Sequence, residues 1–198
     1  MIVFIDRQHT GQPKRIESRG AAKDLDNSGK VETWETEAHW TGYLSIMLEA
    51  QLVAHPEIKV IPISDGSYLQ RHTRVNQYSK MFPNVPQIYL AMHLNAGGGN
   101  YGSMFYHHQS SQGLGLARAI CTGLTSFLPE IPDFKAIKAQ PADWTKNAYY
   151  TIKGVGRPVA ICSEPLFIDT HSNLITVEGM AKVALGMSTG IISWMTDQ

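Results

Sequence analysis

The feature that most restricts the fold of this chain is a regular alternation of short apolar runs with longer segments of helical periodicity. The apolar runs are rich in β-branched and aromatic residues, as strands are, and they cover 1–5, 58–63, 87–92, 102–107 and 158–163. The segments between them repeat apolar residues every three or four positions, and they cover 37–53, 68–81, 112–128 and 176–195. Strands that alternate with helices predict an α/β fold with a twisted, mostly parallel sheet flanked by helices.

Composition narrows the class of protein further. The 198 residues suit one sizeable domain, and the absence of repeats or linker-like stretches predicts a single domain over 1–198. Lys+Arg 17 balances Asp+Glu 17, so nothing in the net charge indicates a nucleic-acid-binding protein. Cys121 and Cys162 lie in apolar stretches and are predicted to be buried, reduced thiols. No window is long and apolar enough to predict a membrane span.

Ionisable side chains follow three of the predicted strands at the point where each strand ends. Asp6 and His9 follow the first strand, His93 follows 87–92, and Glu164 follows 158–163. Because ligands bind at the carboxyl ends of the strands in parallel α/β sheets, these side chains are expected to converge at one edge. Two imidazoles beside carboxylates are typical zinc ligands.

The third zinc ligand is expected at the start of the helix predicted over 37–53. Glu35, Glu37 and His39 are the candidates at that point of the chain. A catalytic zinc usually has three protein ligands and one open position, and Glu37 with the two histidines would complete such a set. Glu164 would then be available as a general base or acid.

Five stretches of the sequence resemble the zinc-dependent N-acetylmuramoyl-L-alanine amidases of bacterial autolysins and phage endolysins, nearly from end to end. IVFIDRQHTG resembles the opening strand and its Asp-x-x-His-x-Gly turn, and ETEAHWTGYLSIMLEAQL resembles the helix that carries the zinc glutamate. RHTRVN resembles the Arg-x-x-x-Ala-Asn stretch, and MHLNAGGGNYGSMFYH resembles the Ser-x-His-x-Asn-Ala segment. RPVAICSEPLFID resembles the strand that ends in the catalytic glutamate.

This resemblance implies a role for each matching residue. His9, Glu37 and His93 would bind Zn²⁺, Glu164 would be catalytic and Asn95 would contact the substrate. The implied substrate is peptidoglycan, cut at the amide bond between N-acetylmuramic acid and L-alanine of the stem peptide. The sequence departs from the family at the turn RQHTG, which replaces smaller residues, and at Met92, where a serine is common.

A second metal site is predicted in DLDNSGKVETWE, residues 24–35. An EF-hand loop takes its oxygen ligands from positions 1, 3, 5, 7, 9 and 12 and has glycine at position 6. Gly29 occupies position 6, and the ligand positions hold Asp24, Asp26, Ser28, Lys30 (through its backbone carbonyl), Glu32 and Glu35. A solvated turn would use similar residues, but a glutamate at the twelfth position favours calcium. We expect this structural Ca²⁺ to order the long link and hold Glu37 in place.

Two further features stay open at the level of sequence. Residues 129–157 are predicted to form a long loop, in which Trp144, Tyr149 and Tyr150 suit a groove for sugar or peptide but would equally suit packing. His171 follows Glu164 closely enough in the chain to be a candidate for the same cleft.

The function expected from these features is that of a peptidoglycan hydrolase. The start MIVFI lacks the features of a secretory signal peptide. We therefore expect a phage or prophage endolysin that is made in the cytoplasm and reaches the cell wall through a holin or another export route. The alternatives are a zinc peptidase or carboxypeptidase that acts on wall peptides, a non-catalytic wall-binding module stabilised by calcium, and a calcium sensor.

Overall fold

The computed structural model of the protein describes residues 1–8, 20–32 and 35–198. A six-stranded sheet forms its middle layer, with the strand order β2-β1-β3-β6-β4-β5. The strands are β1 (Ile2–Arg7), β2 (Lys59–Ile63), β3 (Gln87–Met92), β4 (Gly102–His107), β5 (Phe134–Ala139) and β6 (Val159–Glu164). The four strands β2, β1, β3 and β6 are parallel, whereas β4 runs antiparallel to β6 and β5 follows the direction of β4.

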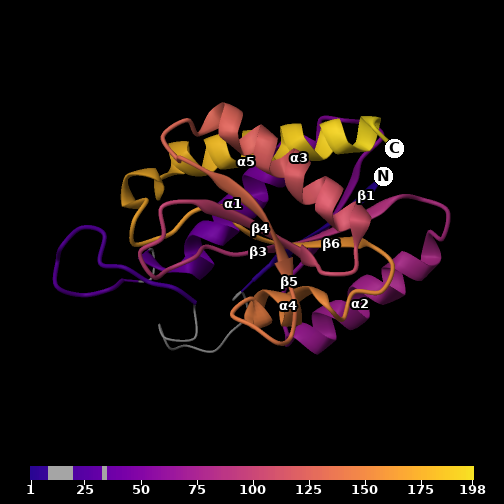
Figure 1. Ribbon diagram of the computed structural model, residues 1–198, viewed down its shortest axis with the longest axis horizontal. Helices are drawn as coiled ribbons and strands as arrows, with labels where there is room; N and C mark the ends of the chain where they lie inside the picture. The colour runs from indigo at the N-terminus through magenta and orange to yellow at the C-terminus, as the bar shows by residue number, and fades with distance from the viewer. Residues whose placement is uncertain (9–19, 33–34) are drawn as a thin grey trace.

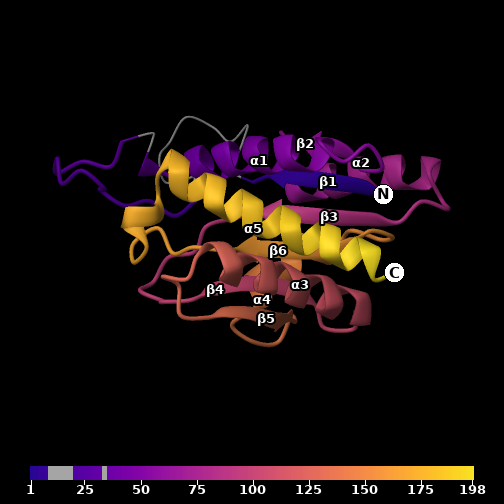
Figure 2. The same cartoon turned by 90° about the horizontal axis from the view of Figure 1, so that it is seen from above.

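Helices cover both faces of this sheet. Helices α1 (Glu37–Val53), α3 (Ser111–Phe127) and α5 (Val177–Thr196) lie on one face. Helices α2 (Tyr68–Met81) and α4 (Lys146–Ile152) lie on the other, and a short 3₁₀ helix, η3 (Ser172–Leu174), precedes α5. Figure 1 shows this three-layer arrangement, and Figure 2 shows α5 lying alongside α3 and α1. The sequence prediction of an α/β fold with a mostly parallel sheet is therefore confirmed.

The two layers of the core follow from the alternation of side chains along each strand. In β1, Val3 and Ile5 pack into the cluster under α1, α3 and α5, whereas Ile2 and Phe4 pack into the cluster under α2 and α4. Both faces of the central strands are buried, which explains why their sequences are continuous apolar runs rather than alternating ones.

Helices α3 and α5 pack at very short distance because glycines face each other between them. A Cβ added at Gly123 would overlap the backbone carbonyl oxygen of Gly186, and one added at Gly190 would overlap the backbone of Ala119 and Ile120. These positions need glycine because the two backbones leave no room for a side chain.

One sequence prediction about the fold is wrong. Residues 129–157 do not form a plain loop, because they contain β5 and α4. In FKAIKA only the two end residues are fully buried, as befits the outermost strand of the sheet, so its apolar signal is weak. Helix α4 spans only seven residues, which is too short for a helical period to be evident.

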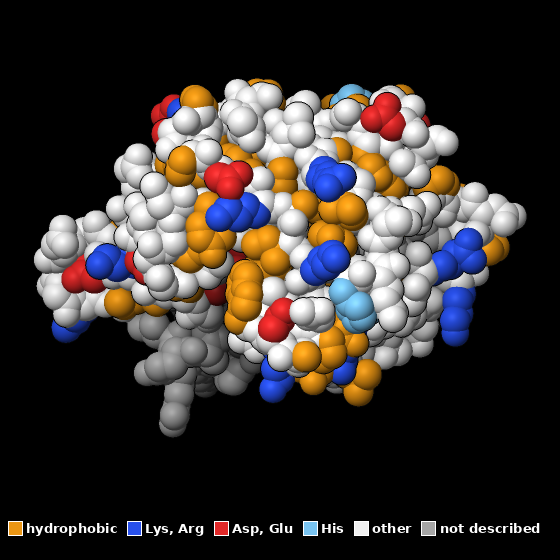
Figure 3. Space-filling view, in the orientation of Figure 1, with side chains coloured by type: hydrophobic (Ala, Val, Ile, Leu, Met, Phe, Trp, Pro, Cys, Tyr) orange, Lys and Arg blue, Asp and Glu red, His pale blue; other side chains and the backbone are white. Residues whose placement is uncertain are grey.

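Other expectations about the chain hold. Cys121 and Cys162 are both buried and unbridged, as predicted. Within the part of the chain that the structure describes, no helix has the length and apolar character that a membrane crossing requires. Figure 3 shows that acidic and basic side chains are scattered over one face of the molecule rather than gathered by sign, in keeping with the balanced composition.

Candidate active site

The pleat of two neighbouring strands brings His93 and Glu164 to the same edge and the same face of the sheet. In β3, Tyr89 and Ala91 point toward the α2 and α4 layer. His93 follows Ala91 by two residues, so the alternation along the strand directs it to the same face. In β6, Cys162 points the same way, and Glu164 follows it by two residues. The backbone N–H of His93 donates to the carbonyl of Ser163 over 2.9 Å, which fixes the two strand ends side by side.

Glu37 reaches this point from the opposite layer. It is the first residue of α1, where the helix dipole favours a carboxylate. Its Oε1 lies 2.7 Å from Nδ1 of His93 and accepts a hydrogen bond from the backbone N–H of Leu94 over 3.2 Å. Both side chains are buried. An imidazole nitrogen and a carboxylate oxygen, the ligand types that zinc prefers, thus face each other.

The segment 20–23 holds the other side of Glu37. The N–H of Ala21 donates to Oε2 of Glu37 over 2.8 Å, and the N–H of Glu37 donates to the carbonyl of Ala21 over 2.7 Å. Gly20 precedes this contact with φ +83°, and any side chain there would overlap the Glu37 carboxylate. The orientation of Glu37 is therefore fixed through both of its oxygens.

The environment of Glu164 raises its pKa into the range that suits a general base or a general acid. Burial and the negative charge of Glu37 raise the pKa of Glu164 to about 7, against the opposing effect of His93. A carboxyl with a pKa near neutrality can both accept and donate a proton at physiological pH. For His93, burial disfavours a positive charge, but the hydrogen bond and charge of Glu37 outweigh it and raise its pKa above 6.5.

These side chains line a cleft of about 320 Å³. The lining includes Glu37, His93 and Glu164, with Leu94 and Cys162. The rest of it is formed by Asn147, Ala148, Tyr150 and Thr151 of α4 and by Tyr68 at the start of α2. The volume is near the lower end of the range for small-molecule sites.

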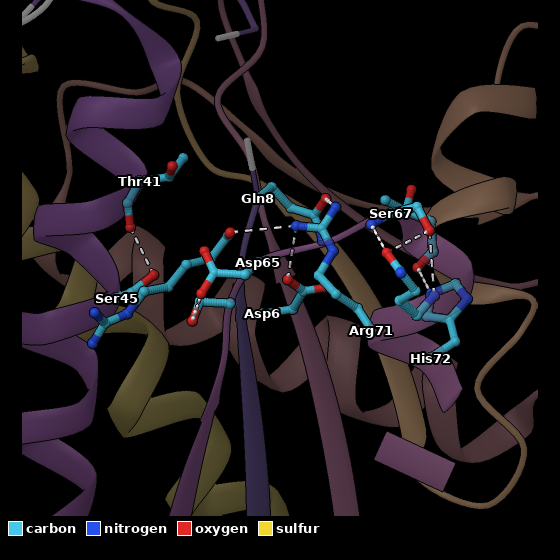
Figure 4. A network of polar contacts seen from close by, with 12 residues as sticks. Asp6, Gln8, Thr41, Ser45, Asp65, Ser67, Arg71 and His72 are labelled. Carbon is cyan, nitrogen blue, oxygen red and sulfur yellow. Dashed lines mark hydrogen bonds and ion pairs between the residues drawn. The ribbon is translucent and has the colours of Figure 1, made fainter. Parts of the chain in front are cut away.

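A buried ion pair stabilises the end of β1 near this cleft (Figure 4). Arg71 Nη1 lies 3.3 Å from Oδ1 of Asp6, and Arg71 Nη2 donates to Oε1 of Gln8 over 3.0 Å. The hydroxyl of Tyr89 donates to the second oxygen of Asp6. Burial raises the pKa of Asp6, although Arg71 opposes the rise. Asp6 therefore acts in the structure as the partner of Arg71 beneath the strand ends.

The residues predicted from the sequence for the active site differ in where the structure places them. The structure brings Glu37, His93 and Glu164 together, whereas His9 lies outside the described residues. Asn95 follows His93 and pairs with Phe167 across an isolated bridge, and its Oδ1 accepts from the N–H of Ala96 over 2.8 Å. Its contact with substrate stays a prediction.

The structure shows where His171 and the aromatic residues of 129–157 lie, which the sequence left open. His171 is buried: its Nδ1 accepts from the N–H of Phe167 over 3.0 Å, and its Nε2 lies 3.1 Å from Oδ1 of Asn100. It therefore joins two loops rather than lining the cleft.

Of the three aromatic residues singled out in 129–157, only Tyr150 lines the cleft. Trp144 and Phe105 form a T-shaped ring pair, and Tyr149 packs beside His107 and His108. Tyr68 was not predicted, although the capping box formed by Ser67 and Gln70 marks the helix start that positions it.

Three carboxylates of the predicted calcium loop lie close together in the structure. Among the described residues, the one group of three side chains that could hold a metal is Asp24, Asp26 and Glu35, whose oxygens lie within 4.8 Å of one another. Glu35 is fully buried, and its oxygens accept hydrogen bonds from the N–H groups of Leu25, Asp26 and Glu32.

The remaining predicted ligands of this loop lie close by. Asp24 accepts from the N–H groups of Ser28 and Gly29 over 3.1 and 2.8 Å. The hydroxyl of Ser28 donates to the carbonyl of Lys30 over 3.1 Å, and Glu32 is exposed. The positive φ of Asn27 and Gly29 produces the tight turn between them.

Comparison by sequence gives no match, either to a protein-family model or to a curated protein. Comparison by structure finds several. An N-acetylmuramoyl-L-alanine amidase from Clostridium difficile 630 shares 19% identity, with a TM-score of 0.75 and coverage of 100% of this chain and 97% of that one.

Two further structures are similar over nearly their whole lengths. The amidase AmiC2 of Nostoc punctiforme shares 14% identity with a TM-score of 0.72, and the alignment covers 99% of this chain and 97% of that one. The catalytic domain of the CD27L endolysin targeting Clostridia difficile shares 18% identity with a TM-score of 0.69, covering 98% and 97%. The chain therefore has the single-domain α/β fold of N-acetylmuramoyl-L-alanine amidase catalytic domains.

Proposed function

We propose that this protein is a zinc-dependent peptidoglycan hydrolase that cuts the amide bond between N-acetylmuramic acid and L-alanine of the stem peptide. The observation that carries the proposal is the meeting of Glu37, His93 and Glu164 in one cleft, on a fold shared with amidases of this activity. A carboxylate and an imidazole placed for a metal, with a near-neutral carboxyl beside them, are the groups that metal-assisted amide hydrolysis requires.

Glu37 and His93 would hold the zinc ion, together with His9 as predicted from the sequence. The two described residues fit zinc because their donor atoms are of the right type, face each other and are buried. A bound Zn²⁺ supplies Lewis acidity toward the scissile carbonyl and lowers the pKa of a water molecule.

Zinc content measures this assignment directly. The purified protein should contain one equivalent of zinc by elemental analysis, and Glu37→Gln should reduce it strongly because it removes an anionic ligand. Glu178→Gln changes an exposed glutamate on α5 and should leave zinc content unchanged. Full zinc occupancy in the Glu37→Gln variant would contradict the ligand set.

Glu164 performs the proton transfers in this proposal. Its carboxylate takes a proton from the attacking water and delivers it to the departing amide nitrogen. A pKa near 7 suits both steps, because the group is neither too weak a base nor too weak an acid.

Digestion of purified sacculi tests the reaction. The wild-type protein should clear them, whereas Glu164→Gln should lose at least about 100-fold in rate, the usual contribution of a general base. A variant that lyses sacculi at the wild-type rate would remove Glu164 from the mechanism. Release of free amino acids in place of muramic acid ends would identify a peptidase.

The loop 24–35 is proposed as a structural calcium site that braces Glu37. The support is the cluster of Asp24, Asp26 and Glu35 and its connection to the zinc ligand. An antiparallel bridge joins Ala22 to Thr36, and the next residue pair, Ala21 and Glu37, makes the two contacts described above. An ion that fixed both ends of the loop would therefore fix Glu37.

Thermal unfolding tests the calcium proposal. Calcium should raise the melting temperature of the wild-type protein because it binds the folded state alone. Asp24→Ala combined with Asp26→Ala should abolish this rise, and Glu130→Ala, an exposed acidic control, should retain it. An unchanged melting temperature of the wild-type protein in saturating calcium would refute the site.

A lytic role of the endolysin type is proposed as the biological setting. The solved structures that share this fold include an endolysin catalytic domain, and they also include the amidase AmiC2 of Nostoc punctiforme. Expression in a bacterial host separates the two settings. The protein should lyse cells when a holin is expressed with it and should not lyse them alone, and lysis without a holin would contradict the role.

A further inference from the structure

Four other residues that line the cleft have no part in the chemistry proposed above. They are Tyr68 at the start of α2 and Asn147, Tyr150 and Thr151 on α4. Tyr150 and Thr151 follow Asn147 by three and four residues, so both lie near it on the helix surface. We call these four residues the α4 wall.

Hydrogen bonds join α4 and the segment that follows it to α2. A ring nitrogen of His72 lies 2.8 Å from the carbonyl oxygen of Thr151. The amide of Asn76 donates to the carbonyl of Gly154 over 2.8 Å and accepts from the N–H of Gly156 over 2.9 Å. A preformed wall loses little conformational entropy when it binds a ligand.

The residue types of the α4 wall suit a peptide. The rings of Tyr68 and Tyr150 offer apolar area with a polar tip, and the amide of Asn147 can donate and accept hydrogen bonds as a peptide group does. Burial raises the pKa of Tyr68 to about 12, so its hydroxyl stays protonated and remains a donor.

Charge distinguishes the catalytic groups from the α4 wall. Glu37 and Glu164 are the acidic residues of the cleft lining. Lys146 and Lys153 flank the wall, with no acidic residue between them in the chain, and Nζ of Lys153 lies 4.0 Å from the centre of the Tyr150 ring. A ligand with a neutral amide at the catalytic groups and a carboxylate along α4 fits this distribution.

We propose that the α4 wall, with Lys153, binds the anionic peptide arm of the substrate and so determines which substrates are cut. This inference rests on the proposed amidase function, because it takes the scissile bond to lie at Glu164. A peptide arm ends in a free carboxylate, whereas the acetylated sugar arm is neutral. The sugar arm is therefore directed away from α4.

Steady-state kinetics on a soluble N-acetylmuramoyl peptide test the proposal. Tyr150→Ala should raise KM about tenfold with a smaller effect on kcat, as loss of an aromatic contact in a binding site does. Tyr78→Ala is the matched control, because Tyr78 is 43% exposed, close to the 40% of Tyr150, and lies on α2 outside the cleft. It should leave KM and kcat unchanged.

Binding to the inactive protein separates peptide from sugar recognition. The zinc-loaded Glu164→Gln variant should bind the peptide acid several-fold more tightly than the same compound with its terminal carboxylate amidated. Addition of Lys153→Met should abolish this preference, because a charged contact is lost. If Tyr150→Ala and Lys153→Met weaken binding of a peptide-free glycan instead, the wall binds sugar and the proposal is wrong.

The outcomes also separate this proposal from the one on which it rests. If the wild-type protein cuts the substrate and KM is unaffected in Tyr150→Ala and Lys153→Met, the α4 wall has no role and the amidase function stands. If the wild-type protein cuts no muramoyl peptide and the Glu164→Gln variant binds none, the amidase function itself fails.

Discussion

Replacement of Glu164 by glutamine should stabilise the metal-free protein at alkaline pH. A carboxyl whose pKa is 4.5 in the unfolded chain and about 7 in the folded protein is protonated more readily when folded. The stability that this protonation contributes is complete below pH 4.5 and is lost as the pH rises through about 7. Glutamine carries no charge at any pH, so the variant avoids this loss.

The size of the effect follows from the two pKa values. Their difference corresponds to roughly 3 kcal/mol once the pH exceeds 8, since each pKa unit is about 1.4 kcal/mol. The pKa of about 7 already includes the opposing effect of His93, and part of the change lies below pH 5, because the unfolded carboxyl titrates near 4.5. Between pH 5 and pH 8.5 we therefore expect the wild-type protein to lose about 2–3 kcal/mol relative to Glu164→Gln.

Urea denaturation followed by circular dichroism measures this difference, with a chelator present so that no cation neutralises Glu164. Other titrating groups occur in both proteins and largely cancel in the comparison. A difference in unfolding free energy that is the same at pH 5 and pH 8.5 would refute the reasoning, because Glu164 would then have an ordinary pKa. Zinc should shift the titration to lower pH, since a nearby cation favours the carboxylate.

Two predictions concern the fold and are measured by the same denaturation assay. Gly123→Ala should destabilise the protein by about 2–4 kcal/mol because its Cβ would overlap the carbonyl of Gly186, whereas Gly42→Ala, at an open position in α1, should stabilise it by up to about 1 kcal/mol. Equal effects of the two substitutions would contradict the close packing of α3 and α5. Arg71→Met should cost about 3–5 kcal/mol because it leaves Asp6 buried without its cation, and adding Asp6→Asn should recover part of the loss. A double variant as unstable as the sum of both single variants would argue against the ion pair.

Much of the fold and part of the site could be predicted from the sequence because both depend on strong periodic signals. The buried strands are continuous apolar runs, and the residue after each strand end was expected at one edge of the sheet. His93 and Glu164 do meet there, and Glu37 joins them from α1.

The part of the cleft lining that α4 contributes could not be predicted from the sequence, and the reasons are again physical. Strand β5 is an edge strand with few fully buried residues, and α4 is shorter than two helical periods, so neither gives a pattern. Tyr68 and Asn147 reach the cleft through the tertiary contacts of His72 and Asn76, which no local sequence signal contains.

The measurement that tests the central proposal most directly is identification of the amino termini released from peptidoglycan. Purified sacculi would be digested with the zinc-loaded protein, and the new amino groups would be labelled and identified by mass spectrometry. Hydrolysis at the proposed bond predicts new L-alanine amino termini with no new reducing sugar ends, and none with Glu164→Gln. Cleavage that exposes any other amino terminus, or no cleavage by the zinc-loaded protein, would contradict the proposal.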